Sequence, residues 1–262
     1  MEYCSGTLKE LINLKTTLCG RQLGEPMNIL EYYMTAMIFQ ALLKAVQYIH
    51  ELEPCIIHRD LKPDNILIEL NGIDFSYIKL CDFGLATVHQ RTDANSYVYN
   101  YHSDCVGTKS YSAPELYTNN HDYDHRIDIY SLSIIGAELF EFNEFPNPPE
   151  QLSYYGEARD KVMQLYLTLC QMNDPIPSER PECSQVLQDY GNWNFSKDYV
   201  KDRAVPFDQL VKKLIPKLHP NQSDQEQLLE RAHIDRDINL SVTIFLIVSD
   251  TSNTKDGKIK YT

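Results

Sequence analysis

Apolar residues recur at intervals of three and four along residues 30–52, the spacing that brings side chains to one face of an α-helix. This pattern predicts a long helix with one face against a core. Residues 127–142 are apolar on nearly every side, which predicts a second helix buried in the middle of a domain.

Shorter elements are predicted around these two helices. Thr7 and Glu10 form a capping box that marks the start of a short helix. Two short strands are predicted at residues 66–70 and 77–81, separated by a turn that begins at Asn71. Further helices are predicted at residues 157–171, 182–190 and 207–218.

The segment 87–108 is polar, rich in Tyr and Ser, and without periodicity, which is typical of a long functional loop. The composition changes at Gly191. We therefore expect residues 1–192 to form one compact domain and residues 193–262 to form an extension of uncertain structure.

The net charge of −13 argues against a nucleic-acid partner, because such partners require a basic surface. The seven cysteines are scattered and show no metal-ligand spacing, so we expect reduced thiols and a cytoplasmic protein. The longest apolar run, residues 242–248, is far shorter than the roughly 20 residues that span a bilayer, and we expect no membrane partner.

The string HRDLKPDN at residues 58–65 carries the first candidate chemistry. A carboxylate at Asp60 and an amide at Asn65, on one loop, can together position an attacking hydroxyl and a metal ion that binds phosphates. Lys62 can place a cation near a transferred phosphoryl group. The alternative for Asp60 is an ordinary solvated carboxylate on a loop.

A second string, DFG at residues 82–84, follows the second predicted strand. It places the carboxylate of Asp82 at a strand end, where Mg²⁺ bridging nucleotide phosphates can bind. Its position after the hairpin makes this short string specific.

With GT at 107–108 and APE at 113–115, these strings occur in the order found in the eukaryotic protein kinase superfamily, which the chain resembles from the hinge onward. The resemblance implies an α+β fold: a mainly helical C-lobe with a small β-hairpin. It also implies ATP and Mg²⁺ as cofactors and a protein Ser/Thr hydroxyl as substrate.

Carried over residue by residue, the resemblance implies that Asp60 is the catalytic base and that Lys62 contacts phosphate. Asn65 and Asp82 would bind metal and nucleotide. Backbone groups of the hinge, from Glu2 to Cys4, would hold adenine.

Other residues have structural roles in the family. Glu115 would pair with Arg180, and Asp128 would brace the backbone of the catalytic loop. Cys81 and His58 are expected to be packing residues. Several local strings resemble kinases of translation initiation factor two alpha, among them MEYC at 1–4 and DIYSL at 128–132.

Arg59 precedes the catalytic aspartate, as in kinases that require a phosphate on the activation loop. An unpaired guanidinium at this position would attract an anion. We therefore expect phosphorylation between Thr87 and Ser110, with Thr108 or its neighbours as candidates. Ordinary loop composition is the alternative explanation for the many hydroxyl groups.

The 262 residues contain no Gly-x-Gly and no candidate for the strand lysine that holds the nucleotide phosphates, so the N-lobe is expected to be absent. Three explanations for this expected absence are a truncated gene model, a short noncatalytic protein, and an N-lobe supplied elsewhere. A partner is then expected to cover the exposed surface. The alternative functions are a pseudokinase-like interaction module and a small-molecule phosphotransferase.

Overall fold

The computed structural model describes residues 6–19, 21–22, 25–68, 78–89, 107–117, 123–142, 155–156 and 158–203. The described part is mainly helical. Its helices are α1 (Leu8–Leu18), α2 (Ile29–His50), α3 (Arg126–Phe140), α4 (Arg159–Met172), α5 (Cys183–Gln188), α6 (Tyr190–Trp193) and α7 (Lys197–Arg203). Its strands are β1 (Gly6–Thr7), β2 (Cys55–Ile57), β3 (Ile66–Ile68), β4 (Ile78–Leu80) and β5 (Thr87–His89).

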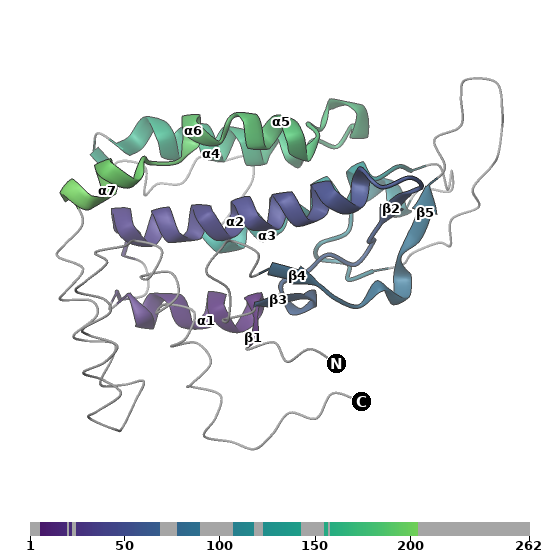
Figure 1. The fold of residues 1–262 in the computed structure, drawn as a ribbon, viewed down its shortest axis with the longest axis horizontal. Helices are drawn as coiled ribbons and strands as arrows, with labels where there is room; N and C mark the ends of the chain where they lie inside the picture. Colours follow the sequence, from purple (N-terminus) through teal and green to yellow (C-terminus); the bar gives the residue numbers. More distant parts are fainter. Residues whose placement is uncertain are drawn as a thin grey trace, which may run out of the picture.

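The two long apolar segments form the centre of the fold. Figure 1 shows α2 running across the middle of the molecule with α3 beside it, α4 to α7 on one side and α1 on the other. The predictions of a long helix near residues 30–52 and a buried helix near 127–142 are therefore confirmed. This central pair positions the loops that carry the candidate chemistry.

Helix α2 is a core helix. The side chain of Asn28 caps its first turn by accepting a hydrogen bond from the backbone N–H of Glu31 at 2.9 Å. The helix is long and apolar enough to span a membrane, but 78% of its most apolar stretch is buried inside the fold. Its apolar character is explained by packing against α3 and α5.

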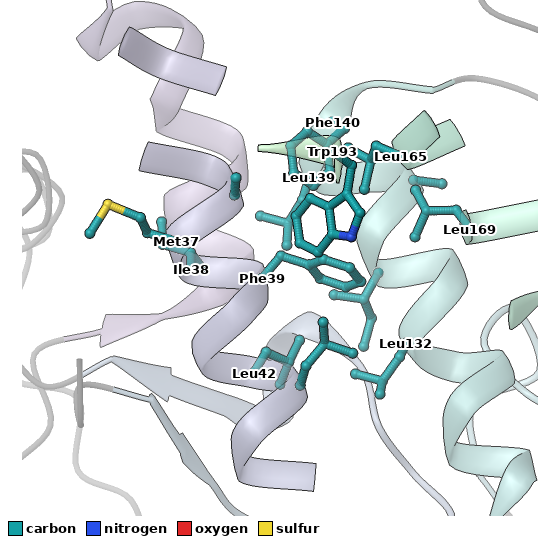
Figure 2. Close-up of a cluster of buried hydrophobic side chains, with 14 of the residues drawn as sticks. Met37, Ile38, Phe39, Leu42, Leu132, Leu139, Phe140, Leu165, Leu169 and Trp193 are labelled. Atoms are coloured by element: carbon teal, nitrogen blue, oxygen red, sulfur yellow. The ribbon is translucent and has the colours of Figure 1, made fainter. Parts of the chain in front are cut away.

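A cluster of aromatic side chains packs α2 against α3 and α6 (Figure 2). Phe39 of α2 lies 6.1 Å from the ring of Phe140 on α3 and 6.1 Å from the ring of Trp193 on α6. Leu165 and Leu169 of α4 line the same cluster. Trp193, Phe195 and Val200 are all buried, so the core includes side chains beyond residue 192.

Helix ends follow the local sequence. The capping box at α1 is confirmed, because Glu10 N–H donates to Thr7 Oγ1 at 3.2 Å and Thr7 N–H donates to Glu10 Oε2 at 2.8 Å. The single helix expected at residues 182–190 is instead two short helices, α5 and α6, that meet at Asp189.

The expected hairpin is present as the antiparallel pair β3 and β4, in which Ile66 faces Leu80 and Ile68 faces Ile78. Strand β1 extends this sheet on the other edge of β3. A second sheet, which pairs β2 with β5, was not predicted. Residues 87–89 were expected to lie in a loop, but they form β5, because Thr87–His89 pairs with Cys55–Ile57.

Several expectations lie outside the described residues. These are the hinge residues Glu2 and Cys4, the turn at Asn71, most of the loop 87–108, and the helix and apolar run after residue 203. The division of the chain at residue 192 stays a prediction.

Candidate active site

The catalytic-loop string lies between β2 and β3, next to the amino-terminal end of α3. Asp128, in the first turn of α3, is completely buried. Its carboxylate accepts hydrogen bonds from the backbone N–H of His58 at 2.8 Å and of Arg59 at 2.9 Å. The expectation that Asp128 braces the backbone of this loop is confirmed.

His50 is a third donor to Asp128, since its Nε2 lies 3.0 Å from Oδ2, the oxygen that also accepts from the His58 N–H. Burial alone would raise the pKa of Asp128, but the hydrogen bonds from His50, His58 and Arg59 outweigh it and lower the pKa below its usual value. The carboxylate is therefore ionised at neutral pH and only accepts hydrogen bonds.

Asp60 is held by groups from two segments. Its Oδ1 accepts hydrogen bonds from the backbone N–H and from the hydroxyl of Thr108, each at 2.9 Å. Its Oδ2 accepts from Lys62 Nζ at 2.7 Å and from Asn65 Nδ2 at 3.0 Å. The structure thus brings together three of the predicted site residues, and the interpretation of Asp60 as a solvated loop carboxylate is inconsistent with this packing.

These contacts set the charge of Asp60. Burial would raise its pKa, but the hydrogen bonds from Lys62 and Thr108 and the positive charge of Lys62 together lower it. The carboxylate is ionised at neutral pH, which a group that accepts a proton requires.

Thr108 was expected only as a candidate for phosphorylation, yet its hydroxyl lies inside the site. It donates to Asp60 and accepts from Lys62 Nζ at 2.9 Å. A phosphate here would stand against the Asp60 carboxylate, so the geometry disfavours Thr108 as an activating site. Gly107 permits the close approach, since its φ is +96° and an added Cβ would lie 2.5 Å from the Arg59 carbonyl oxygen.

Asn65 and Asp82 come to the same end of the β3–β4 hairpin. Asn65 precedes β3, and its carbonyl oxygen accepts from the N–H of Cys81 at 3.0 Å, which places Asp82 one residue beyond that bond. Asp82 is exposed, with a left-handed backbone (φ 59°), and among the described residues its carboxylate accepts only a long 3.4 Å bond, from Gly84 N–H.

This donor set fits Mg²⁺. The amide nitrogen of Asn65 donates to Asp60, which leaves the amide oxygen as the ligand atom, and Asp82 supplies a carboxylate oxygen. Within the part of the chain that the structure describes, no group of three or more His, Cys, Asp or Glu side chains is placed to hold a metal. A two-residue site suits Mg²⁺, which takes its other ligands from water and phosphates.

His58 is a packing residue, as expected. It is completely buried, its Nε2 lies 3.0 Å from the carbonyl oxygen of Cys81, and its ring lies 4.8 Å from that of Phe83. The histidine therefore ties the catalytic loop to the DFG segment.

The expectation of an unpaired guanidinium at Arg59 is wrong. Its Nε donates to the carbonyl oxygen of Leu85, and its Nη1 donates to the hydroxyl of Tyr123 at 2.8 Å. Arg59 thus connects the catalytic loop to Leu85, just after the DFG string, and to Tyr123, just before α3. Phosphorylation between Thr87 and Ser110 stays a prediction.

The pair of Glu115 and Arg180 is confirmed. Arg180 Nη2 donates to Glu115 Oε2 at 2.8 Å, and Nη1 donates to Oε1. The Arg180 side chain has no exposed surface. Because Nη1 also donates to the carbonyl oxygen of Arg126 at 3.0 Å, the pair anchors the APE segment to the start of α3.

Sequence reasoning missed the roles of His50, Tyr123 and Thr108 in this site. Each lies in a different segment from the motif residue that it contacts, and the Thr108 contact joins residues 48 positions apart. A GT pair before APE was the one available signal, and it pointed to Thr108 without indicating its partner.

Comparisons with known proteins agree with this geometry. The family model described as protein kinase domain matches residues 1–230. The chain is 29% identical, over 72% of its length, to bovine eukaryotic translation initiation factor 2-alpha kinase 3, of which this match covers 17%.

Two further relatives are also kinases. A putative serine/threonine-protein kinase of Mycoplasma pneumoniae is 28% identical over 95% of the chain and 65% of its own length. Human cyclin-dependent kinase 20 is 31% identical over 68% of the chain and 44% of its own length. The chain thus spans less than two thirds of the length of each of these relatives. Because the family model matches residues 1–230, the chain belongs to the protein kinase domain family.

Proposed function

We propose that this chain carries the catalytic and metal-binding residues of a protein serine/threonine kinase, which transfers the γ-phosphoryl group of ATP to a protein hydroxyl. The observation that carries the proposal is the set of contacts around Asp60. An ionised, buried carboxylate is held by Lys62, Thr108 and Asn65, and the exposed carboxylate of Asp82 follows the adjacent hairpin.

In the proposed reaction, Asp60 orients the substrate hydroxyl and accepts its proton as the hydroxyl oxygen bonds to the γ-phosphorus. The bond from that phosphorus to the bridging oxygen of ADP breaks. Lys62, 2.7 Å from Asp60, stabilises charge on the transferred group. Asn65 and Asp82 would hold Mg²⁺, which neutralises charge on the ATP phosphates when bound.

Serine and threonine are the proposed acceptors, because the Mycoplasma pneumoniae relative is named a putative serine/threonine-protein kinase. The protein substrate is proposed to be translation initiation factor two alpha. The name of the bovine relative and the local strings at residues 1–4 and 128–132 support this choice.

Catalysis also requires a glycine-rich loop, a strand lysine and a helix glutamate. The 262 residues contain no Gly-x-Gly. We therefore expect negligible phosphoryl transfer from these residues alone, because a glycine-rich loop that would help to hold the ATP phosphates is not among them.

The test compares the 262-residue chain with a chimera that carries the glycine-rich loop, lysine and glutamate of the bovine relative ahead of Met1. Both are incubated with Mg²⁺, labelled ATP and translation initiation factor two alpha. We expect the chimera to label serine or threonine of the added protein and the 262-residue chain alone to be inactive. Asp60→Asn in the chimera should abolish the label. A chimera that folds and binds ATP but labels no protein would contradict the proposal.

A noncatalytic interaction module is the second candidate. Phe83 follows Asp82 and is 44% exposed. A partner that packs against this apolar side chain would remove it from water. An N-lobe or another protein could supply that cover. The same chimera separates the two candidates, because a pure interaction module would bind without labelling any protein.

A further inference from the structure

A pair of buried histidines lies behind the catalytic loop. His50 ends α2 and His125 precedes α3, and their rings lie 4.9 Å apart in an edge-to-face arrangement. His50 is 5% exposed and His125 is 7% exposed. Histidine is seldom buried without a specific hydrogen-bond partner, so each ring requires an explanation.

Each ring contacts a different carboxylate. His50 Nε2 lies 3.0 Å from Asp128, and His125 Nε2 lies 2.7 Å from Oε2 of Glu182 at the start of α5. The hydrogen bond from His125 is the main reason that the pKa of Glu182 is lowered, and Arg126, which pairs with the other oxygen at 2.8 Å, adds to it.

These contacts fix the direction of the hydrogen bonds. Both carboxyl groups have lowered pKa values, so both are ionised and accept only. Each histidine must therefore donate from Nε2. The contacts form one chain from Glu182 through His125 and His50 to Asp128, which holds the backbone of the catalytic loop.

We propose that His125 is a positioning residue: anchored by Glu182, it fixes the ring of His50, and His50 in turn orients Asp128 toward the His58 and Arg59 amides. The structure thereby links the start of α5 to the loop that carries Asp60. His50 Nδ1 has no hydrogen-bond partner in the described part of the chain, so among these residues the bond to Asp128 is the one hydrogen bond that orients the ring, and the His125 ring packs against it.

The proposal rests on the proposed function only in that Asp60 is the group being positioned. Its test therefore uses amide hydrogen exchange, measured by NMR on the 262-residue chain, and requires no kinase activity. Failure of the chimera to phosphorylate would leave this measurement unaffected. The amides of His58 and Arg59 report directly on the bonds to Asp128.

Two substitutions separate the two contacts of His125, the packing of its ring against His50 and its hydrogen bond to Glu182. His125→Phe keeps a ring against His50 but loses the donor to Glu182, whereas His125→Gln keeps a donor N–H. We expect His125→Phe to lower the protection of the two amides about tenfold, the size of effect of one lost hydrogen bond to a charged group. His125→Gln keeps the donor but loses the ring against His50, so it should restore only part of that protection.

Asn173→Ala is the matched control, because it removes another hydrogen bond to α3, the 2.9 Å bond from Asn173 to Ser133, which does not involve Asp128. It should leave both amides protected as in the wild type. If His125→Phe does not fold, Glu182→Gln, which removes the charge but keeps an oxygen that accepts from His125, should give a smaller loss at the same two amides. Unchanged protection in these variants, or an equal loss across all core amides, would overturn the proposal.

Discussion

The carboxylate of Asp128 lies 2.8 Å from the backbone N–H of His58, although the two residues are 70 positions apart in the chain. The contact joins the centre of the core to the loop that carries Asp60. Because most side chains of the helix that bears Asp128 are buried, the catalytic loop takes its position from a helix packed into the core.

Removing one partner of the buried ion pair between Glu115 and Arg180 should strongly destabilise the fold. Glu115→Ala leaves the guanidinium of Arg180 buried without its carboxylate, and we expect a loss of about 3–5 kcal/mol in the free energy of unfolding. Urea denaturation measures this loss. Lys9→Ala is the control, since it removes a half-exposed pair with Glu138 and should cost less than about 1 kcal/mol.

Gly107 should tolerate no side chain. Its φ of +96° lies in the left-handed region, and an added Cβ would press on the Arg59 carbonyl oxygen. We expect Gly107→Ala to destabilise the fold by at least about 1–2 kcal/mol, the usual strain of a left-handed residue. Gly191→Ala is the control, because no atom lies within 4 Å of its added Cβ. Equal melting temperatures for the two variants would contradict this account.

The long helices could be predicted because each repeats its apolar spacing over several turns. The strands β1, β2 and β5 could not, since each has two or three residues and pairs with a distant segment, as Cys55 does with His89. Motif spacing likewise indicated Asp60 and Asp82. It gave no sign that His50 would contact Asp128, because only the packing of α2 against α3 brings these residues together.

Phe39 should be one of the side chains on which the core depends. It is completely buried between Phe140 and Trp193, and Phe39→Ala would leave a cavity there. We expect a loss of about 3–5 kcal/mol in the free energy of unfolding. Tyr48→Ala changes an aromatic residue on the same helix that is 68% exposed, and should alter stability by no more than about 0.5 kcal/mol.

The stabilisation that Asp60 provides should depend on pH. Its folded pKa lies below that of an unfolded aspartate, about 3.9, so its contribution is fully present above that value and is lost as the pH falls through the folded pKa. We expect Asp60→Asn to be less stable than the wild type by a constant amount from about pH 5 to 7. Below about pH 4 the difference should shrink. Urea denaturation from pH 3 to 7 measures it, and a difference that does not vary with pH would be inconsistent with these contacts.

Asp82 should control the Mg²⁺ requirement of the active chimera. Its carboxylate is exposed at the end of the hairpin that also positions Asn65, so it can reach a metal ion bound to ATP. Loss of a group that merely orients a ligand weakens metal binding about 10–100-fold, and loss of the ligand itself should cost at least as much. We expect Asp82→Asn to raise the Mg²⁺ concentration for half-maximal transfer by at least about tenfold. Asp64→Asn removes an exposed carboxylate beside Asn65 and should leave the Mg²⁺ requirement unchanged. Equal shifts for the two variants would mean that general negative charge, rather than a ligand at Asp82, attracts the metal.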